Sequence, residues 1–281
     1  MIRKYAAYAG LMVAMTLLPL AGALAQGVVG QPTDWELGLQ AAADDRMERI
    51  IGLHNFVLVI ITVICLFVLG LLTWIMIRFN AKANPTPSVT THNTILEVLW
   101  TVVPVAILVT IAIPSFRLLY YEDVIPQTDM TVKAIGKQWF WSYEYPDNGN
   151  FTFDSQGLSD RVAATQMEPR LLGTNNHVVV PVNKTIRLIT TGADVIHAWA
   201  IPAFGVKIDA VPGRINTTWF HPTKEGKFYG ECSELCGARH AFMPIEVEVV
   251  SQERFDQWVQ EAKTKFATVG APTRFAAEQQ Q

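Results

Sequence analysis

Two long runs without a charged side chain constrain this chain most strongly. The first, FVLVIITVICLFVLGLLTWIMI, extends from Phe56 to Ile77, and as a helix it would cross about 30 Å of hydrocarbon. The second, VLWTVVPVAILVTIAIPSF, extends from Val98 to Phe116 and contains two prolines, which neighbouring helices can accommodate within a membrane. The two runs predict a transmembrane hairpin. A buried helix of a soluble protein is the alternative interpretation of the second run.

The N-terminus has the order of regions found in exported proteins. Arg3 and Lys4 are followed by an apolar run that ends in Ala-Leu-Ala at residues 23–25. A basic, a hydrophobic and a small-residue region in this order are typical of a secretory signal. We therefore expect a signal peptide that is cleaved after Ala25, with an uncleaved membrane anchor as the alternative.

The loop between the two apolar runs indicates their orientation. Its basic residues are Arg78 and Lys82, directly after the first run, and its acidic residue is Glu97. Basic residues near the ends of spans favour the cytoplasmic side, so this loop is predicted to be cytoplasmic. Both ends of the hairpin then face the exported side, in agreement with the secretory signal.

The chain from residue 122 onward has the pattern of a β domain. Short β-rich runs alternate with turn residues, as in NHVVVPVNKTIRLITTGADVIHAWAIPAF, and this spacing predicts a β sandwich or barrel. Acidic side chains outnumber basic ones by 19 to 15 in this part, which disfavours nucleic acid and favours a basic protein partner. In SQERFDQWVQEAKTKF the apolar residues predict a short amphipathic helix, and the tail after it is predicted to be disordered.

The stretch ECSELCGARHAFM, residues 231–243, combines four side chains that bind soft metals: Cys232, Cys236, His240 and Met243. Thiolate, imidazole and thioether are the ligands of blue-copper sites, and a second cysteine would allow two sulfurs to bridge two copper ions. A disulfide in an exported domain and a zinc site remain alternatives. Cys65, inside the first apolar run, is interpreted as a packing residue.

A second imidazole must come from elsewhere in the β domain. The candidates are His177, His197 and His221. His197 lies in a β-rich run that ends at Pro202, and a position between strand and loop suits a ligand. A histidine in an apolar strand is also commonly packed in a core, so the pattern by itself does not select among the three.

Three stretches together carry a resemblance to a known family: QWFWSYEYP at 138–146, DVIHAWAIPAFGVKIDAVPGR at 194–214 and CSELCGARHAFMPI at 232–245. The chain resembles subunit II of a haem-copper cytochrome c oxidase of the bacterial aa3 type over nearly its whole length. The resemblance implies a two-helix transmembrane hairpin followed by an all-β, cupredoxin-like Greek-key barrel. The implied organisation is a signal peptide at 1–25, an exported segment and hairpin at 26–121, a periplasmic cupredoxin domain at 122–250, and a C-terminal amphipathic helix with a flexible tail at 251–281.

The resemblance implies a dinuclear copper (CuA) centre. Cys232 and Cys236 would bridge the two ions, and the remaining ligands would be His197, His240, Met243 and the backbone carbonyl of Glu234. The Glu234 carboxylate would also help to hold a magnesium or manganese ion shared with subunit I, since such hard cations prefer oxygen ligands. Solvation is the alternative role of that carboxylate.

Two further residues take roles from the resemblance. It places Trp139 at the surface, where electrons would arrive from cytochrome c, whereas strand alternation predicts that Trp139, Trp141, Tyr143 and Tyr145 form a buried aromatic stripe. It makes Glu97 the mouth of a proton pathway, whereas a charge at the end of a span can also simply be solvated. The acidic residues expected to dock a lysine-rich cytochrome are Glu144, Asp147 and Asp194.

Two residues depart from the family pattern. Phe140 stands where the family commonly has tyrosine, and Glu231 stands where it commonly has glutamine. The first change removes a hydroxyl group. The second adds a negative charge beside the copper ligands, which is expected to lower the reduction potential of the centre, and neither change removes a ligand.

The resemblance predicts a subunit that takes electrons from cytochrome c and passes them to haem in subunit I, where oxygen is reduced to water with proton pumping. The expected partners are subunits I and III, cytochrome c and the lipid bilayer, and the expected location is a bacterial inner membrane with both mature termini and the copper domain in the periplasm. A membrane-anchored copper-delivery protein is the alternative function. A quinol oxidase subunit would lack the copper ligands, and nitrous oxide reductase needs a further large domain.

Overall fold

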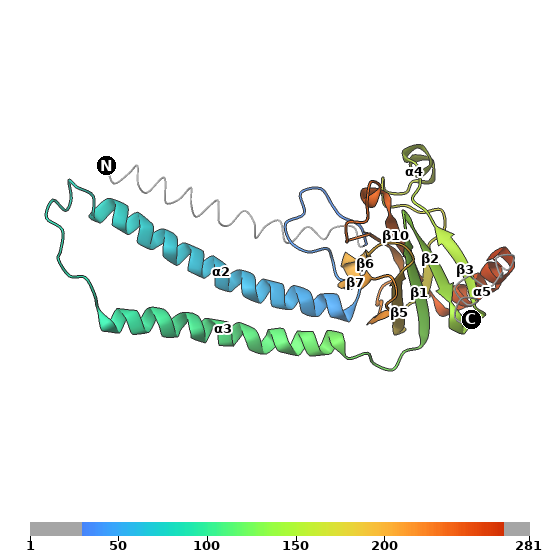
Figure 1. Cartoon of the computed structure of the whole chain (residues 1–281), viewed down its shortest axis with the longest axis horizontal. Coiled ribbons are helices and arrows are strands. Elements are labelled where there is room, and N and C mark those ends of the chain that lie inside the picture. The colour runs from blue at the N-terminus through green and yellow to red at the C-terminus, as the bar shows by residue number, and fades with distance from the viewer. Residues whose placement is uncertain (1–29, 267–281) are drawn as a thin grey trace. The chain divides into compact units, whose positions relative to one another are not determined.

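A computed structural model describes residues 30–266 of the chain (Figure 1). The predicted signal peptide at 1–25 and the C-terminal tail lie outside these described residues. The described chain forms two compact units, one of residues 49–124 and one that combines residues 30–48 with residues 125–266. The first unit is helical and the second is rich in β-strands.

The helical unit consists of the two apolar helices predicted from the sequence. They are α2, Asp45–Arg78, and α3, Thr94–Asp123. Both are long and apolar enough to cross a membrane, and the most apolar part of each is unburied within the chain. Each helix extends beyond its uncharged run into polar residues at both ends. The transmembrane-capable hairpin predicted from the sequence is therefore confirmed.

Helix α3 has a well-defined beginning. The side chain of Asn93 caps it by accepting hydrogen bonds from the backbone N–H of Ile95 at 3.1 Å and of Leu96 at 3.2 Å. The Glu97 carboxylate accepts a hydrogen bond from the Asn93 N–H at 3.2 Å. These bonds satisfy groups that a helix N-terminus leaves without an intrahelical partner.

The β-rich unit contains three sheets. The largest has the strand order β3-β2-β1-β5-β8, the second β4-β10-β9, and the third pairs β6 with β7. The β1–β5 and β4–β10 pairs are parallel, and the other strand pairs are antiparallel. The strands are β1 Met130–Lys137, β2 Phe140–Tyr145, β3 Phe151–Ser155, β4 Val178–Pro181, β5 Ile186–Gly192, β6 His197–Ile201, β7 Val206–Ala210, β8 Asn216–Phe220, β9 Gly226–Glu231 and β10 Pro244–Val250.

The core of this unit is aromatic and aliphatic. In β1 every second residue is buried, as expected for a strand with one face toward a core. Trp141, Tyr143 and Tyr145 of β2 are fully buried, so the predicted aromatic stripe is confirmed at these positions. Trp139 precedes the strand and is only partly buried, packed against the edge of the core.

Two further helices flank the strands. α5, Gln252–Phe266, is the predicted amphipathic helix, and it buries Phe255, Val259 and Ala262. The short α4, Asp160–Gln166, was not predicted from the sequence.

The segment from residue 30 to residue 48 also belongs to the β-rich unit. The N–H of Ala43 donates to the Ala203 carbonyl at 2.9 Å, and the N–H of Thr223 donates to the Ala43 carbonyl at 2.9 Å. The Asp44 carboxylate, buried, accepts a hydrogen bond from the His221 N–H. These contacts attach the segment that leads into α2 to the connections between the strands of the β-rich unit.

Candidate metal centre

The loop with the paired cysteines connects two neighbouring antiparallel strands, β9 and β10. Strand β9 ends one residue before Cys232, and β10 begins one residue after Met243, with Glu231 opposite Pro244. The N–H of Cys232 donates to the Met243 carbonyl at 3.0 Å and closes the base of the loop. The loop is therefore held at both ends by a regular sheet.

His197 reaches the loop from another strand. It is the first residue of β6, and the N–H of Ser233 donates to the carbonyl of its neighbour Ala198 at 3.0 Å. A Cβ atom on Gly136 would lie 2.6 Å from the His197 ring, and one on Gly230 would lie 1.8 Å from the Ala200 carbonyl oxygen. Both glycines provide room, because any side chain there would overlap with β6.

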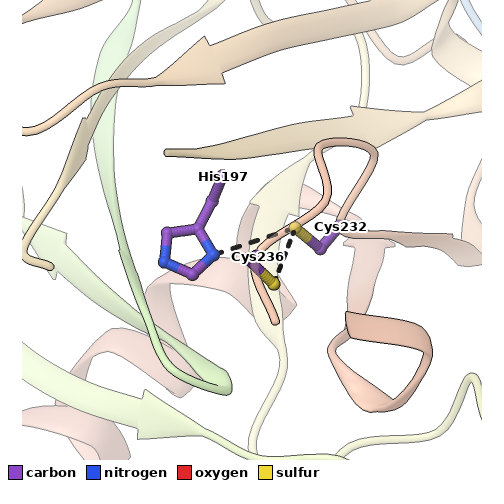
Figure 2. A group of neighbouring side chains, drawn as sticks. All are labelled: His197, Cys232 and Cys236. Carbon is purple, nitrogen blue, oxygen red and sulfur yellow. Dashed lines mark hydrogen bonds between the residues drawn. The ribbon is translucent and has the colours of Figure 1, made fainter. Parts of the chain in front are cut away.

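The ligand atoms of three side chains converge beneath the loop. In Figure 2 dashed lines join the Cys232 sulfur to His197 Nδ1, 3.8 Å away, and to Cys236 Sγ, 3.9 Å away. The ligand atoms of these three residues lie within 4.8 Å of one another, and the residues are buried. Both cysteines are free thiols. This arrangement could hold a soft metal.

The remaining predicted ligands lie around the three. His240 Nδ1 is 3.6 Å from Cys236 Sγ. The Cys232 thiol donates to the Glu234 backbone carbonyl at 3.3 Å. Met243 is 1% exposed, whereas the Glu234 side chain is exposed. Of the candidate histidines only His197 and His240 reach the cysteines; among their described contacts, His177 pairs with Glu248 at 2.8 Å and His221 with Thr185 at 3.2 Å.

A carboxylate orients the His197 ring. His197 Nε2 lies 2.8 Å from Asp194 Oδ1. When Nε2–H donates to this carboxylate, a neutral imidazole leaves the lone pair of Nδ1 directed at Cys232 Sγ. A carboxylate that fixes the tautomer of a histidine in this way is a common support of metal sites. Asp194 was predicted from the sequence only as a docking residue.

The two thiols differ in acidity because their surroundings differ. Burial raises the pKa of Cys232, but hydrogen bonds with His197 and with the backbone of Glu234 and Ala198 outweigh it, so the net pKa lies well below the usual thiol value. Burial and the adjacent Cys232 sulfur raise the pKa of Cys236. One thiolate forms readily, and the second needs a cation to offset its charge. A metal would provide that cation and release both protons.

Two side chains support the loop from the β1–β2 connection. Gln138 Nε2 donates to the Cys236 carbonyl at 2.8 Å, and Trp139 Nε1 donates to the same carbonyl at 3.2 Å. The role of Gln138 was not predicted from the sequence. The position of Gln138 next to Trp139 was the one hint in the sequence. It could not indicate the contact with Cys236, because the two residues are 98 positions apart in the chain.

The residues predicted to dock a cytochrome have partners within the chain. Glu144 forms an ion pair with Lys133 at 2.8 Å, which reduces the charge it presents to a partner. Asp147 is exposed and accepts a hydrogen bond from the Thr131 N–H at 2.7 Å. Glu97 belongs to the helical unit, at the beginning of α3, and takes no part in the cluster.

Comparison with known proteins identifies relatives that align with most of the chain. The family model for the periplasmic domain of cytochrome c oxidase subunit II matches residues 130–250, and that for its transmembrane domain matches residues 32–118. A probable cytochrome c oxidase subunit 2 of Rickettsia felis is 50% identical over 247 residues, covering 88% of this chain and 78% of the relative. Cytochrome c oxidase subunit 2 of Cereibacter sphaeroides is 43% identical over 253 residues, covering 84% and 83%.

A solved structure is also similar. The crystal structure of the periplasmic domain of subunit II of cytochrome oxidase from Bradyrhizobium japonicum has 60% sequence identity and a TM-score of 0.48, and covers 51% of this chain and 99% of that chain. The two family models and the relatives that align along most of the sequence agree with one another. This chain belongs to the cytochrome c oxidase subunit II family.

Proposed function

We propose that this chain is the subunit of a haem-copper oxidase that receives electrons from cytochrome c at a dinuclear copper centre and delivers them to haem in subunit I. The observation that carries the proposal is the convergence of Cys232, Cys236 and His197 from two separate segments of the β-rich unit. Family membership supports the oxidase. The combination of thiol and imidazole side chains supports a copper centre.

The residues present fit two copper ions. Cys232 and Cys236 would bridge them, with His197 and His240 as the imidazole ligands. Met243 and the Glu234 carbonyl would complete the set. Copper suits this mixture better than zinc does, because a buried thioether contributes little to a zinc site. When bound, two copper ions bridged by thiolates supply a one-electron relay that changes oxidation state with little rearrangement.

The protein's own part is to hold these ligands and to exclude water. Cys232, Cys236 and Met243 are each 3% exposed or less, and His197 is fully buried. Their surroundings tie the loop to β6 and to the β1–β2 connection. Ligands fixed in this way need little reorganisation when the charge of the centre changes. Burial also argues against a copper-delivery protein, which needs accessible ligands for exchange.

We assign electron uptake to Trp139. It is partly buried, and its Nε1–H donates to the carbonyl of Cys236, so the ring lies between the surface and a proposed ligand. The carboxylates of Glu144, Asp147 and Asp194 would attract a basic cytochrome, mainly by raising the rate of encounter. The ion pair of Glu144 with Lys133 makes it the weakest of the three for this purpose.

Two carboxylates are assigned to ions and protons. The exposed Glu234 side chain is free to contribute to a magnesium or manganese ion shared with subunit I, while its carbonyl faces Cys232. Glu97, at the opposite end of α3 from the β-rich unit in sequence, is assigned to the mouth of a proton pathway. Its position in the first turn of an apolar helix supports that role.

The architecture is proposed to follow the family. We assign a cleaved signal peptide to residues 1–25, a membrane hairpin within 26–121 and a cupredoxin-like Greek-key barrel to 122–250, followed by the helix and tail at 251–281. The hairpin would lie in a bacterial inner membrane with its loop in the cytoplasm and the copper domain in the periplasm. Subunits I and III would be its partners there.

Copper analysis tests the function directly. The full-length protein should bind two copper ions per chain and give the paramagnetic resonance spectrum of one electron shared over both. Cys236→Ser should abolish this spectrum, because one bridging thiolate is lost. Cys65→Ser is the matched control, since Cys65 is exposed on α2, and it should leave copper content and spectrum unchanged. One copper per chain with an ordinary blue-copper spectrum would overturn the dinuclear assignment.

A further inference from the structure

A cavity lies between α2 and α3, and none of its lining residues is a proposed copper ligand. Its volume is about 270 Å³, and all its lining residues belong to the helical unit. The lining residues are Arg49, Gly52, Leu53, Phe56, Pro114, Arg117 and Leu118. A cavity of this size is smaller than the sites that enclose whole drug-sized ligands, so it suits only a part of a larger molecule.

The lining residues form one continuous face on each helix. Arg49, Gly52, Leu53 and Phe56 follow one another at helical spacing, as do Pro114, Arg117 and Leu118. The guanidinium of Arg49 lies over the ring of Tyr121, 4.1 Å from its centroid. Because the helices run in opposite directions (Figure 1), Arg49 and Tyr121 lie at one level, and Phe56 and Pro114 lie about two turns further into the hairpin.

The cavity therefore has a basic mouth and an apolar floor. Arg49 and Arg117 supply two guanidinium groups, and within residues 30–266 neither forms an ion pair with a carboxylate. Phe56 and Pro114 supply the floor. A cation at the margin of a hydrocarbon layer is stabilised when it reaches an anion at the headgroup level.

With the apolar runs placed in a bilayer, the two arginines would lie near the level of the lipid headgroups. Arg49 precedes the apolar run of α2, and Arg117 directly follows the apolar run of α3. Both apolar runs thus end at the cavity. When the anion is a lipid headgroup, the apolar tails of the lipid continue along Phe56 and Pro114. A free inorganic anion has no tails and would leave that floor in contact with water.

We propose that this cavity binds the phosphodiester group of a membrane phospholipid, with Arg49 and Arg117 as its cationic ligands. The guanidinium fork matches phosphate oxygens by paired hydrogen bonds. Gly52 borders open space, since a Cβ atom at this position would meet nothing within 4 Å, so a large side chain there would extend into the cavity. The site joins the two helices through a bound lipid at the end of the hairpin nearest to the β-rich unit in sequence.

The test counts bound lipid on the assembled oxidase. The complex is stripped of lipid in a neutral detergent and titrated with phosphatidylglycerol, and native mass spectrometry follows the bound lipids. Arg49→Gln and Arg117→Gln should each weaken one lipid site about fivefold, as expected for one cation near an anionic group. Gly52→Leu fills the cavity while retaining both guanidiniums, and it should remove that site. Arg78→Gln, at the other end of α2, should leave all lipid sites intact.

Competition identifies the group that is recognised. Diacylglycerol with the same acyl chains, and inorganic phosphate, should each compete far more weakly than phosphatidylglycerol. Equal competition by diacylglycerol would show an apolar hole, and equal competition by phosphate would show a site for soluble anions; either result overturns the proposal. An unchanged lipid count in all three cavity variants, with assembly intact, would show that a partner subunit fills the cavity and would overturn it as well.

Discussion

At the scale of single residues, Asp194 connects the chemistry of the site to its geometry. Its Oδ1 lies 2.8 Å from His197 Nε2, and its Oδ2 accepts a hydrogen bond from the Gln138 N–H at 2.6 Å. Burial raises the pKa of Asp194, but the bonds from His197 and the backbone outweigh it, so the carboxyl stays ionised. One side chain thus orients a proposed ligand and fastens the β1–β2 connection.

Substitutions of Asp194 should show whether it acts by orienting the His197 ring or by its negative charge. Asp194→Ala removes the acceptor for His197 Nε2–H, and we expect copper affinity to fall by about 10- to 100-fold, as for other supports of metal-binding histidines. Asp194→Asn keeps one acceptor oxygen and should retain most of the affinity. Competition with a copper chelator measures both. Asp209→Ala, at an exposed position, controls for lost charge, and equal affinity in all three variants would refute the orienting role.

Glu168 is a second residue with a clear effect, since it makes the stability of the fold sensitive to acid. Lys227 forms ion pairs with Glu168 and, at 3.0 Å, with the buried Glu246, and Tyr229 donates to Glu168 at 2.7 Å. Burial raises the pKa of Glu168, but these bonds outweigh it and hold the net pKa below the ordinary 4.5. A lowered pKa means that the ionised group stabilises the fold above pH 4.5. That stabilisation disappears as the pH falls through the folded-state pKa.

Glu168→Gln should therefore cost stability at neutral pH and little in acid. We expect a loss of about 1–3 kcal/mol in the free energy of unfolding at pH 7, because partners in a part-buried network lose a charged acceptor. The loss should vanish well below pH 4.5. Urea unfolding of the full-length protein, followed by tryptophan fluorescence across this range, measures it. Glu225→Gln, at an exposed position, is the control, and a loss that does not change with pH would contradict the assignment.

The sequence predicts ligands better than it predicts their supports. Cys232, Cys236 and His240 lie within one short motif, so residue type and spacing were sufficient to select them as candidate ligands. The support from Gln138 to the Cys236 carbonyl spans 98 residues, and that from Asp194 to the Gln138 N–H spans 56. Contacts of that range depend on how strands pair, which local patterns do not encode.

At the scale of elements, β9 passes unusually close to β6. A Cβ atom on Gly230 would lie 1.8 Å from the Ala200 carbonyl oxygen and 3.0 Å from Ile201. The Ala200 carbonyl oxygen belongs to the backbone of a buried strand, so it cannot move away by a side-chain rotation. This approach brings the cysteine loop, which follows β9, next to His197, which begins β6.

Gly230→Ala should thus affect both the fold and the copper site. Overpacking of a well-packed core costs about 1–3 kcal/mol, and the upper end of that range is expected here because a backbone must move. Copper retention should fall in parallel, since the strands that carry the ligands separate. Gly70→Ala adds the same methyl group where nothing lies within 4 Å, and it should change neither quantity. Wild-type unfolding and copper content in Gly230→Ala would show that the strands can separate freely.

The strength of local patterns also determines which elements could be predicted. The uncharged runs identified α2 and α3, and the spacing of Phe255 and Ala262 identified α5. The parallel pairing of β1 with β5 and of β4 with β10 was not predictable, because alternation reports which face is buried and not which strand is the neighbour. The attachment of residues 30–48 to the β-rich unit rests partly on backbone hydrogen bonds, which leave no sequence pattern, and partly on side chains such as Arg46, whose partner Thr218 is 172 residues away.

At the scale of the whole molecule, Trp139 should affect the rate of electron uptake without affecting the centre itself. In the assembled oxidase, Trp139→Phe should slow reduction by cytochrome c on the order of tenfold, as expected when a productive contact geometry is lost. The copper spectrum should stay unchanged, because Gln138 still donates to the Cys236 carbonyl. Stopped-flow reduction provides the rate. Trp35→Phe, at a tryptophan 96% exposed, is the control, and loss of copper in Trp139→Phe would restore a purely structural role.

Glu97 connects two roles that one pair of substitutions can separate. Its carboxylate accepts a hydrogen bond from the Asn93 N–H at 3.2 Å, so it stabilises the beginning of α3. In the proposed orientation it would also lie where protons could be collected from the cytoplasmic water without the larger cost of a carboxylate at the bilayer centre. Glutamine can accept the same hydrogen bond but cannot carry a proton, whereas alanine can do neither.

If Glu97 collects protons, both Glu97→Gln and Glu97→Ala should slow steady-state oxygen uptake by the assembled oxidase. We expect an effect on the order of tenfold, at the lower end of what a positioned proton-transfer group contributes. Reduction of the copper centre by cytochrome c should remain fast in both variants, since the proposed route brings electrons through the β-rich unit and not through α3. If the carboxylate only caps the helix, Glu97→Gln should respire at the wild-type rate and only Glu97→Ala should lose stability or assembly. Stopped-flow reduction and oxygen uptake on the same preparations, repeated across pH, distinguish the two outcomes.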